Sequence, residues 1–299
     1  MNTSFVIRGV IPPLVTPLTD GGKDIDEDAL QAHVTWLIEK GVRGVMPCGT
    51  TGEGPLLATS ERKRVLEVVS EAAAHRVPVI AHVGAVTTYE TVELACHAQA
   101  LGVEVVSVVT PYYFHLSGEA LTEHFCRIAD AVASTPVFLY NIPQNTGNAI
   151  SPLIVESIIT RCPNVIGIKD SGGDLRTLQG FTSLDGGRFQ VVCGNDQLLL
   201  RALQAGACAS ISGNANVFPE VVVELFNCFW HGDSVGALRQ QEQLDQVREL
   251  LQNGQSLSLL KRALGFRGLR GGSVRPPLLE VAPEIVASAE KGLRSLQLL

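Results

Sequence analysis

The chain has 299 residues, of which 45% are hydrophobic and 18% charged, so it can bury a large core in one or two globular domains. Its formal net charge of -7 argues against non-specific nucleic-acid binding, which needs a basic surface to neutralise phosphate. The seven cysteines are scattered without a CxxC pair, which is more typical of reduced thiols than of disulfides or a zinc site.

Targeting and membrane signals are missing from the sequence pattern. Met1 to Val10 contains no basic segment followed by an apolar run, so we expect no signal peptide. The most apolar stretch, Val103 to Thr110, is too short to span a bilayer and contains Glu104. These features predict a soluble, cytoplasmic protein with no membrane partner.

From residue 9 onward one unit recurs, made of a short apolar run, a turn of Gly, Pro, Ser or Thr, and a longer helical pattern. The eight apolar runs are Gly9–Thr16, Val42–Cys48, Val77–Val83, Val103–Val109, Val137–Tyr140, Val165–Lys169, Phe189–Cys193 and Ala209–Ser212. Strands that alternate with helices over roughly 220 residues predict an α/β fold, a closed (β/α)8 TIM barrel. An open doubly wound sheet is the alternative, which the lack of a GxGxxG motif after the first strand weakens.

Helix-start signals separate the apolar runs. Asp26, the Thr87–Glu90 capping box and the pair Ser151-Pro152 each precede a helical pattern. The other expected helices include Glu61–Ala74, Gly118–Ser134, Asp174–Thr182, Gln197–Ala205 and Pro219–Trp230.

Past Trp230 the strand signals stop. Three helical segments follow, Asp233–Gln252, Ser256–Leu264 and Pro283–Leu298, and Arg267–Pro277 is expected to form an exposed turn between two of them. We therefore predict a barrel over residues 1–231 and a C-terminal helical region over residues 232–299.

The stretch Val165–Gly173 is central to the functional interpretation. Its β-branched residues predict a short buried strand ended by a Gly-Gly turn, with Lys169 at the C-terminal end of the strand. Burial beside a dry core favours the uncharged amine, which is a nucleophile toward ketones. Lys169 is therefore a candidate Schiff-base lysine; alternatively, it reaches solvent and pairs with Asp170.

The second predicted strand is followed by the turn Cys48–Gly54. Its glycines let the backbone turn tightly and expose N–H groups, and the hydroxyls of Thr50 and Thr51 join these donors. This combination predicts a nest for a carboxylate, although a plain β-to-α turn with threonine caps is the alternative.

Later strand ends also carry polar side chains. Tyr140, at the end of the fifth predicted strand, would point its hydroxyl into the barrel mouth near Lys169, where a phenol can pass protons. The loop Thr110–Phe114 holds two of the four tyrosines, which pack an interface or line a pocket. The turns Gly194–Asp196 and Ser212–Asn216 could bind substrate hydroxyls or cap helices.

Four motifs stand at these strand ends in order: GTTGE (49–53), TPYY (110–113), YNIP with TG (140–147) and GIKDSGGD (167–174). Together with the segment Arg275–Leu278, they resemble the dihydrodipicolinate synthase / N-acetylneuraminate lyase family of Schiff-base 2-oxo-acid aldolases over nearly the whole chain. The resemblance implies a (β/α)8 barrel, a homotetramer built as a dimer of dimers, and no metal or organic cofactor.

The resemblance also assigns roles to residues of this chain. Lys169 would form the imine with pyruvate or another 2-oxo acid, and Tyr140 would be the proton-relay phenol. Thr50 and Thr51 would hold the carboxylate of the 2-oxo acid, with Thr50 also in the relay. Tyr113 matches the tyrosine that completes the relay in a neighbouring subunit.

The remaining expected substrate-binding residues lie in the loops around these groups. Gly194 and Ile211 match pocket-wall positions of the family, and the polar turn at Ser212 would suit a hydroxylated substrate tail. Dihydrodipicolinate synthases carry an arginine in the segment after YN.P, which binds the carboxylate of the second substrate. Asn145 occupies this position here and brings neither a charge nor a bidentate fork.

The predicted function is therefore a lyase that joins or separates pyruvate and an aldehyde. A 2-oxo-3-deoxy sugar acid or a similar 4-hydroxy-2-oxo acid is the favoured substrate, with aldolase or dehydratase chemistry. Sialic-acid lyases usually have Ser before Thr in the GTTGE position, where this chain has Thr50. The alternatives are a dihydrodipicolinate synthase that condenses pyruvate with aspartate semialdehyde, and a non-catalytic barrel that binds a 2-oxo acid.

Overall fold

The computed structural model describes residues 5–299, which form two compact units. The first unit contains the chain up to Gly9 together with Pro78–Ile211, and the second contains Val10–Val77 together with Ser212–Leu299. Residues 1–4, part of the segment in which no signal peptide was expected, lie outside the described residues. Within residues 5–299, no helix combines the length and the apolar character needed to cross a membrane.

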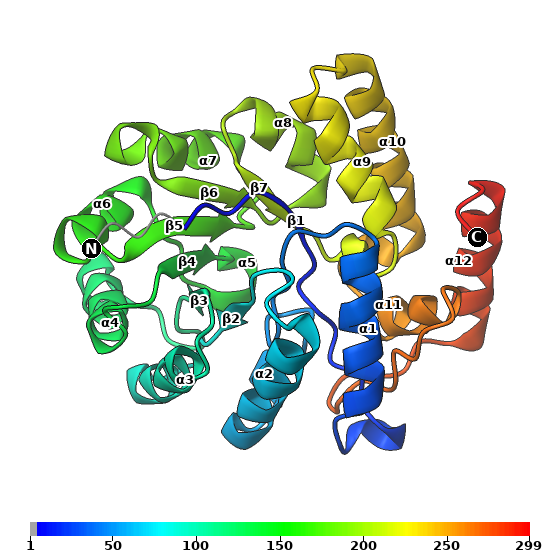
Figure 1. Cartoon of the computed structure of the whole chain (residues 1–299), viewed down its shortest axis with the longest axis horizontal. Coiled ribbons are helices and arrows are strands. Elements are labelled where there is room, and N and C mark those ends of the chain that lie inside the picture. The colour runs from blue at the N-terminus through cyan, green and yellow to red at the C-terminus, as the bar shows by residue number, and fades with distance from the viewer. Residues whose placement is uncertain (1–4) are drawn as a thin grey trace. The chain divides into compact units, whose positions relative to one another are not determined.

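Parallel strands form the centre of the first unit (Figure 1). They are β2 (Ile80–His82), β3 (Val105–Val109), β4 (Val137–Asn141), β5 (Val165–Asp170), β6 (Gln190–Cys193) and β7 (Ala209–Ile211). The strand order of the sheet is β1-β7-β6-β5-β4-β3-β2, where β1 is Gly9–Ile11. Almost every strand residue is buried, as expected for Val- and Ile-rich strands covered on both faces.

Helices connect consecutive strands of the first unit. Figure 1 shows α3, α4, α6 and α7 packed one beside the next along the outside of the strands. The helices are α3 (Thr88–Ala100), α4 (Gly118–Ala131), α5 (Pro143–Thr146), α6 (Pro152–Arg161), α7 (Leu175–Thr182) and α8 (Leu199–Gln204). The side chains of Thr87, Ser151 and Asp174 accept backbone hydrogen bonds from the first turns of α3, α6 and α7, which confirms these predicted helix starts.

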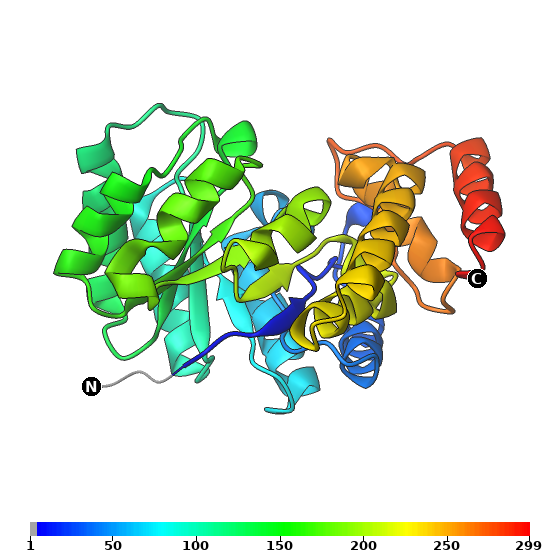
Figure 2. The same cartoon turned by 90° about the horizontal axis from the view of Figure 1, so that it is seen from above.

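The second unit is mainly helical. Its helices are α1 (Glu27–Glu39), α2 (Thr59–Ala73), α9 (Pro219–Trp230), α10 (Ser234–Leu250), α11 (Leu257–Gly265) and α12 (Pro283–Ser295). Figure 2 shows α9 and α10 side by side, and α12 also contacts α10 and α11. The three helices expected after Trp230 are therefore present, whereas the domain division at residues 231 and 232 stays a prediction.

The second predicted strand, Val42–Cys48, is wrong as a continuous strand. Within residues 5–299 it is reduced to bridges, among them an isolated parallel bridge between Met46 and Pro13. The amide of Leu14 donates to the Met46 carbonyl at 2.9 Å, and the Met46 amide donates to the Pro12 carbonyl at 3.0 Å. The two prolines have no N–H to donate, so the ladder cannot extend along the first strand.

The predicted α/β fold of TIM-barrel type is nevertheless confirmed by the parallel strands and their connecting helices. Within the described part of the chain the sheet has seven strands in place of the eight expected. The same proline pair also shortens the first predicted strand, Gly9–Thr16, to Gly9–Ile11.

The segment 267–277 is less exposed than its Gly, Arg and Pro content suggested. Gly271 and Val274 are buried, Gly272 forms a parallel bridge with Leu18, and the Ser273 amide donates to the Leu18 carbonyl at 3.0 Å. A side chain at Gly272 would place its Cβ 2.2 Å from the Leu18 carbonyl oxygen, so only glycine allows this approach. The segment is therefore an integral part of the second unit and not an exposed turn.

A buried histidine in the second unit links α1 to the turn before α9. His33 Nε2 lies 3.0 Å from the carbonyl oxygen of Asn216, and since a carbonyl only accepts, Nε2 carries the hydrogen. Asn216 in turn donates its side-chain amide to Pro13 O at 2.9 Å and accepts from Val15 N at 3.1 Å. Burial lowers the pKa of His33 from 6.5 to about 4.

This histidine predicts a loss of stability at acidic pH. The unfolded state takes up a proton as pH falls through 6.5, whereas the folded state does so only near 4. The free energy of unfolding should therefore fall between these pH values, by about 3 kcal/mol for this one group. Urea denaturation at several pH values should show a smaller decrease for His33→Gln, which keeps a donor for Asn216.

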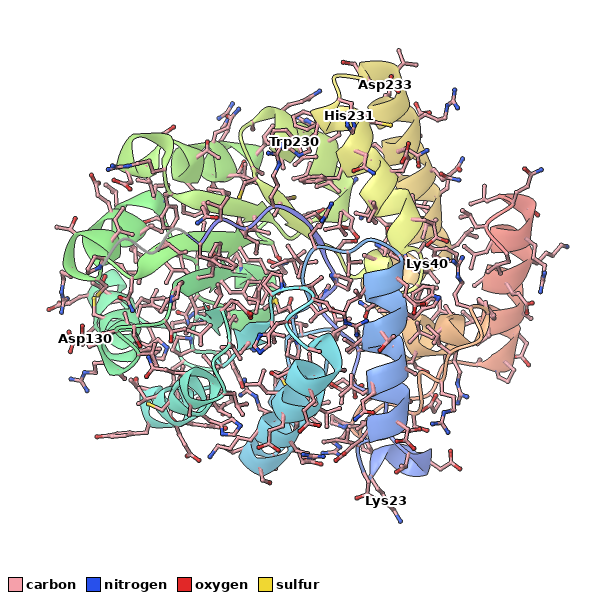
Figure 3. The ribbon with its side chains drawn as sticks, in the orientation of Figure 1. Lys23, Lys40, Asp130, Trp230, His231 and Asp233 are labelled. Carbon is pink, nitrogen blue, oxygen red and sulfur yellow. The ribbon has the colours of Figure 1, made fainter. Side chains whose placement is uncertain are left out.

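The matched control is His231→Gln. Figure 3 shows His231 at the end of α9, and its side chain is exposed. The free energy of unfolding of this control should change with pH as it does in wild type. If the free energy of unfolding of His33→Gln falls with pH as steeply as that of wild type, His33 is not the group that causes the loss of stability.

Candidate active site

Tyr140 and Lys169 are direct neighbours on adjacent strands of the first unit. They are paired in the parallel register of β4 and β5, and paired residues project to the same face of a sheet. Lys169 Nζ lies 3.8 Å from the centroid of the Tyr140 ring, which is a cation–π geometry. Lys169 is only 4% exposed, so the lysine does not reach solvent as the alternative interpretation required.

The residues paired with Tyr140 and Lys169 on the outer neighbouring strands are apolar. The register places Val109 beside Tyr140 and Val192 beside Lys169. Gly167, two residues before Lys169 and on the same face, leaves space that the Phe138 ring fills, since a Cβ there would lie 2.4 Å from that ring.

Asp170 is engaged on the opposite face of β5. Its Oδ1 accepts from Asn141 Nδ2 at 2.8 Å and from the Gly172 amide at 3.2 Å, and Asn141 Oδ1 accepts from the Ile150 amide at 3.0 Å. Burial raises the pKa of Asp170, and these two hydrogen bonds oppose the rise. Asp170 therefore fixes the ends of β4 and β5 rather than forming the Lys169–Asp170 pair considered from the sequence.

Gly194 and Ile211 lie at strand ends of the first unit. The Gly194 amide donates to the Asp170 carbonyl at 2.8 Å, and an added Cβ would lie 3.0 Å from Lys169 Cε and 2.1 Å from Ser171 Oγ. Ile211 is buried at the end of β7, and the strand registers place it on the face that carries Lys169. Both positions expected to form a pocket wall are thus on the side of the amine.

His82 is a neighbour of Tyr140 that the sequence analysis missed. It is the last residue of β2 and is buried, and its ring lies 5.9 Å from the Tyr140 ring at an interplanar angle of 86°. This is an edge-to-face contact of the kind that aromatic rings prefer. The signal available in the sequence was a single polar residue inside the apolar run Val77–Val83.

Tyr113 and Asn145 lie in more exposed parts of the first unit. Tyr113 is 87% exposed, has a φ of 81° and contacts Phe114 edge to face at 5.1 Å. Asn148 holds this loop because its side-chain amide donates to the carbonyls of Pro111 and Phe114, both at 2.8 Å. Asn145 is exposed on α5, a short helix that the sequence analysis did not predict.

Thr50, Thr51 and Ser212 belong to the second unit. Thr50 is exposed and Thr51 is half-buried, with its Oγ1 3.9 Å from the position of a Cβ on Gly213. Ser212 is buried, and its hydroxyl accepts from the Ala215 amide at 3.3 Å. The structure thus brings Thr51 next to the turn that follows Ser212.

The turn Cys48–Gly54 differs from the expected nest in one respect. The amides of Gly52 and Gly54 both donate to the Gly49 carbonyl at 3.1 Å, so they close the turn itself. A Cβ on Gly54 would lie 1.9 Å from the Cys48 carbonyl oxygen, which explains why glycine is needed there. Donors for a carboxylate must therefore come from the threonines and not from these glycine amides.

No group of three or more His, Cys, Asp and Glu residues in the described chain, residues 5–299, is arranged to hold a metal ion.

The position of Gly194 allows a direct test of the amine's environment. In Gly194→Ala the new methyl group should displace the Ser171 hydroxyl and crowd the Lys169 side chain. If Lys169 forms the imine with pyruvate that the sequence resemblance implies, we expect adduct formation to slow by about tenfold or more, because small displacements of a reacting group are costly. Trapping with borohydride and mass spectrometry would measure this rate.

Gly265→Ala is the control, since nothing lies within 4 Å of a Cβ at that glycine and its φ is not positive. It should react at the wild-type rate. Equal rates for the two variants would contradict the crowding of Lys169.

Comparisons with known proteins agree over nearly the whole chain. The model of the dihydrodipicolinate synthetase family matches residues 6–296. A 4-hydroxy-tetrahydrodipicolinate synthase of Methanopyrus kandleri is 36% identical over 295 residues, covering 99% of this chain and 98% of that protein. An uncharacterized DapA-like lyase of Halobacterium salinarum is 39% identical over 293 residues, covering 98% of this chain and 95% of the relative.

Solved structures show the same similarity. YagE from E. coli K12, a prophage protein of the dihydrodipicolinic acid synthase family in complex with pyruvate, superposes with a TM-score of 0.93 at 31% identity, covering 99% of this chain and 100% of that chain. Dihydrodipicolinate synthase from Aquifex aeolicus gives a TM-score of 0.92 at 31% identity, covering 98% of this chain and 99% of that chain.

Proposed function

The chain belongs to the dihydrodipicolinate synthetase family, and from this premise we propose that Lys169 forms a Schiff base with pyruvate during the making or breaking of a carbon–carbon bond. As a member of this family, the chain is a lyase of the class I aldolase type that acts on pyruvate. The observation that supports Lys169 is its burial, with Nζ 3.8 Å from the centroid of the Tyr140 ring. YagE, the relative crystallised in complex with pyruvate, supports the choice of 2-oxo acid.

The mechanism follows from an amine beside a phenol. Lys169 attacks the 2-oxo carbon, and loss of water gives a protonated imine. This cation accepts the electron pair of the C3–C4 bond as it breaks, which leaves an enamine. Tyr140 takes the proton from the 4-hydroxyl group while its own proton passes on through the Thr50–Tyr113 relay or a water, so that the fragment leaves as an aldehyde. Protonation at C3 and hydrolysis of the imine then release pyruvate and restore Lys169.

The other roles are proposed from the chemistry of the residues and from the family resemblance. Thr50 and Thr51 offer hydroxyl donors for the carboxylate, and Thr50 also takes part in proton transfer together with Tyr113. Tyr113 acts across a subunit boundary in a homotetramer, a dimer of dimers, in which its exposed ring would be covered. The reaction uses no metal or organic cofactor, since the imine itself is the electron sink, and takes place in the cytoplasm.

For the second substrate we propose an aldehyde that carries hydroxyl groups. The natural substrate would then be a 2-oxo-3-deoxy sugar acid or a related 4-hydroxy-2-oxo acid. Asn145 is exposed on α5 and can exchange hydrogen bonds with hydroxyls, whereas it lacks the charge that a second carboxylate favours. Gly194, Ile211 and Ser212 would line the remainder of the pocket.

A second candidate is the condensation of pyruvate with aspartate semialdehyde. It is favoured by the similarity to the 4-hydroxy-tetrahydrodipicolinate synthase of Methanopyrus kandleri. The uncharged Asn145 argues against it.

Borohydride trapping tests the nucleophile. Pyruvate and borohydride should leave a reduced adduct on Lys169, because reduction of the imine makes the bond permanent. Tyr140→Phe should still form the adduct but lose at least about 100-fold in cleavage of a 2-oxo-3-deoxy acid, since proton transfer contributes on the order of 10²- to 10⁴-fold. An adduct of the same yield in Lys169→Ala would refute the assignment of this lysine.

Substitution of Asn145 tests the second substrate. Wild-type protein should release pyruvate from members of a panel of 2-oxo-3-deoxy sugar acids and turn over aspartate semialdehyde poorly. Asn145→Arg should raise kcat/KM for aspartate semialdehyde by roughly tenfold, because the guanidinium pairs with its carboxylate.

Ala149→Arg, which adds the same charge at a nearby exposed position, should leave kcat/KM unchanged. Efficient condensation with aspartate semialdehyde by the wild-type protein would favour the second candidate instead.

A further inference from the structure

A buried ion pair connects the Thr50–Thr51 turn to α11 within the second unit. The carboxylate of Glu53 pairs with Lys261 Nζ, and both side chains are completely buried. Glu53 belongs to the turn after the second predicted strand, and Lys261 to the C-terminal helical region. Burial of two charged side chains away from water is costly, so such a pair is found only where each charge is paired and hydrogen-bonded.

Two hydrogen bonds connect the pair to the segment that follows α11. Lys261 Nζ donates to the Ser273 carbonyl at 2.7 Å, and the Arg275 amide donates to Glu53 Oε2 at 2.7 Å. Burial lowers the pKa of Lys261, and the attraction of Glu53 opposes this shift. The pair is therefore part of a larger network rather than an isolated contact.

Arg275 extends this network to the start of α2. Its guanidinium bonds Glu61 Oε2 at 2.6 Å and donates to the carbonyls of Gly22 at 2.9 Å and Lys23 at 2.6 Å. Glu61 also accepts from the Ala58 amide at 2.8 Å. The chain on the C-terminal side of the turn is thus held by the same segment.

The backbone of the turn needs such support. Glu53 has a φ of 57°, in the left-handed region that is unfavourable for a residue with a long side chain. Its amide donates to the Thr50 carbonyl at 3.1 Å, so the conformation of Glu53 is coupled directly to that of Thr50. A further hydrogen bond holds the turn, because Thr16 Oγ1 donates to the Gly52 carbonyl at 2.8 Å.

We propose that the Glu53–Lys261 pair is a positioning device that holds Thr50 and Thr51 in the conformation that binds the carboxylate of the 2-oxo acid. α11 and the segment 267–277 would then set the affinity for this substrate although neither contacts it. The proposal rests on the proposed function of Thr50 and Thr51, and it assigns a functional role to the C-terminal helical region.

The test compares three variants with wild type. Glu53→Gln and Lys261→Met each leave one buried charge unpaired, whereas the double variant removes both charges at similar side-chain volume. The measured quantity is the pyruvate concentration that gives half-maximal adduct on Lys169 after borohydride reduction. It needs no knowledge of the aldehyde, and thermal denaturation in parallel reports whether each variant is folded.

We expect the half-saturating pyruvate concentration of the folded double variant to rise by roughly tenfold or more, because the threonines lose their fixed geometry. The maximal amount of adduct should stay at the wild-type level, since Lys169 is unchanged. Lys261→Arg keeps the cation and should lie closer to wild type than Lys261→Met. Arg294→Gln is the control, because its pair with Glu290 on α12 is half-exposed and should not affect pyruvate.

Several outcomes would overturn the proposal. A folded double variant with wild-type half-saturation would show that the pair does not position the turn. A double variant that fails to fold would make the pair a requirement of folding and not of affinity. If wild-type protein forms no adduct at all, the proposed function fails instead, which separates the two conclusions.

Discussion

The parallel register of β4 and β5 is the constraint on which the candidate chemistry depends. It pairs Tyr140 with Lys169, and because paired residues share a face, the amine and the phenol ring become buried neighbours. Asp170 and Asn141 project to the other face and fasten the two strand ends to each other. The register of the two strands thus places the amine of Lys169 beside the ring of Tyr140. It also keeps the carboxylate of Asp170 on the opposite face, away from this amine.

Close packing around this pair relies on the absence of side chains at specific positions. Gly167 leaves room for the Phe138 ring, and Gly194 leaves room for the Lys169 stem and the Ser171 hydroxyl. The buried ring of His82 then contacts Tyr140 edge to face. Each contact restricts the rotamers of the two proposed catalytic residues, and preorganisation of this kind is what makes proton transfer efficient.

In the second unit, charged side chains rather than apolar packing hold the loop of interest. The turn that carries Thr50 and Thr51 contains a left-handed Glu53, and a fully buried ion pair with Lys261 keeps that residue in place. A charged network of this kind contributes more to a defined geometry than to stability. The proposed role of the pair would give α11, which has no proposed contact to substrate, a part in substrate binding.

The sequence alone determined the alternation of strands and helices, the helix starts at Asp26, Thr87 and Ser151, and the family, because these follow from local periodicity, capping chemistry and short motifs. It also placed Lys169 and Tyr140 at strand ends. Only the tertiary structure decided that the Pro12-Pro13 pair reduces the second strand to bridges, that His82 contacts Tyr140, and that Lys261 joins Glu53. These contacts depend on strand register and on segments distant in sequence, which no local pattern encodes.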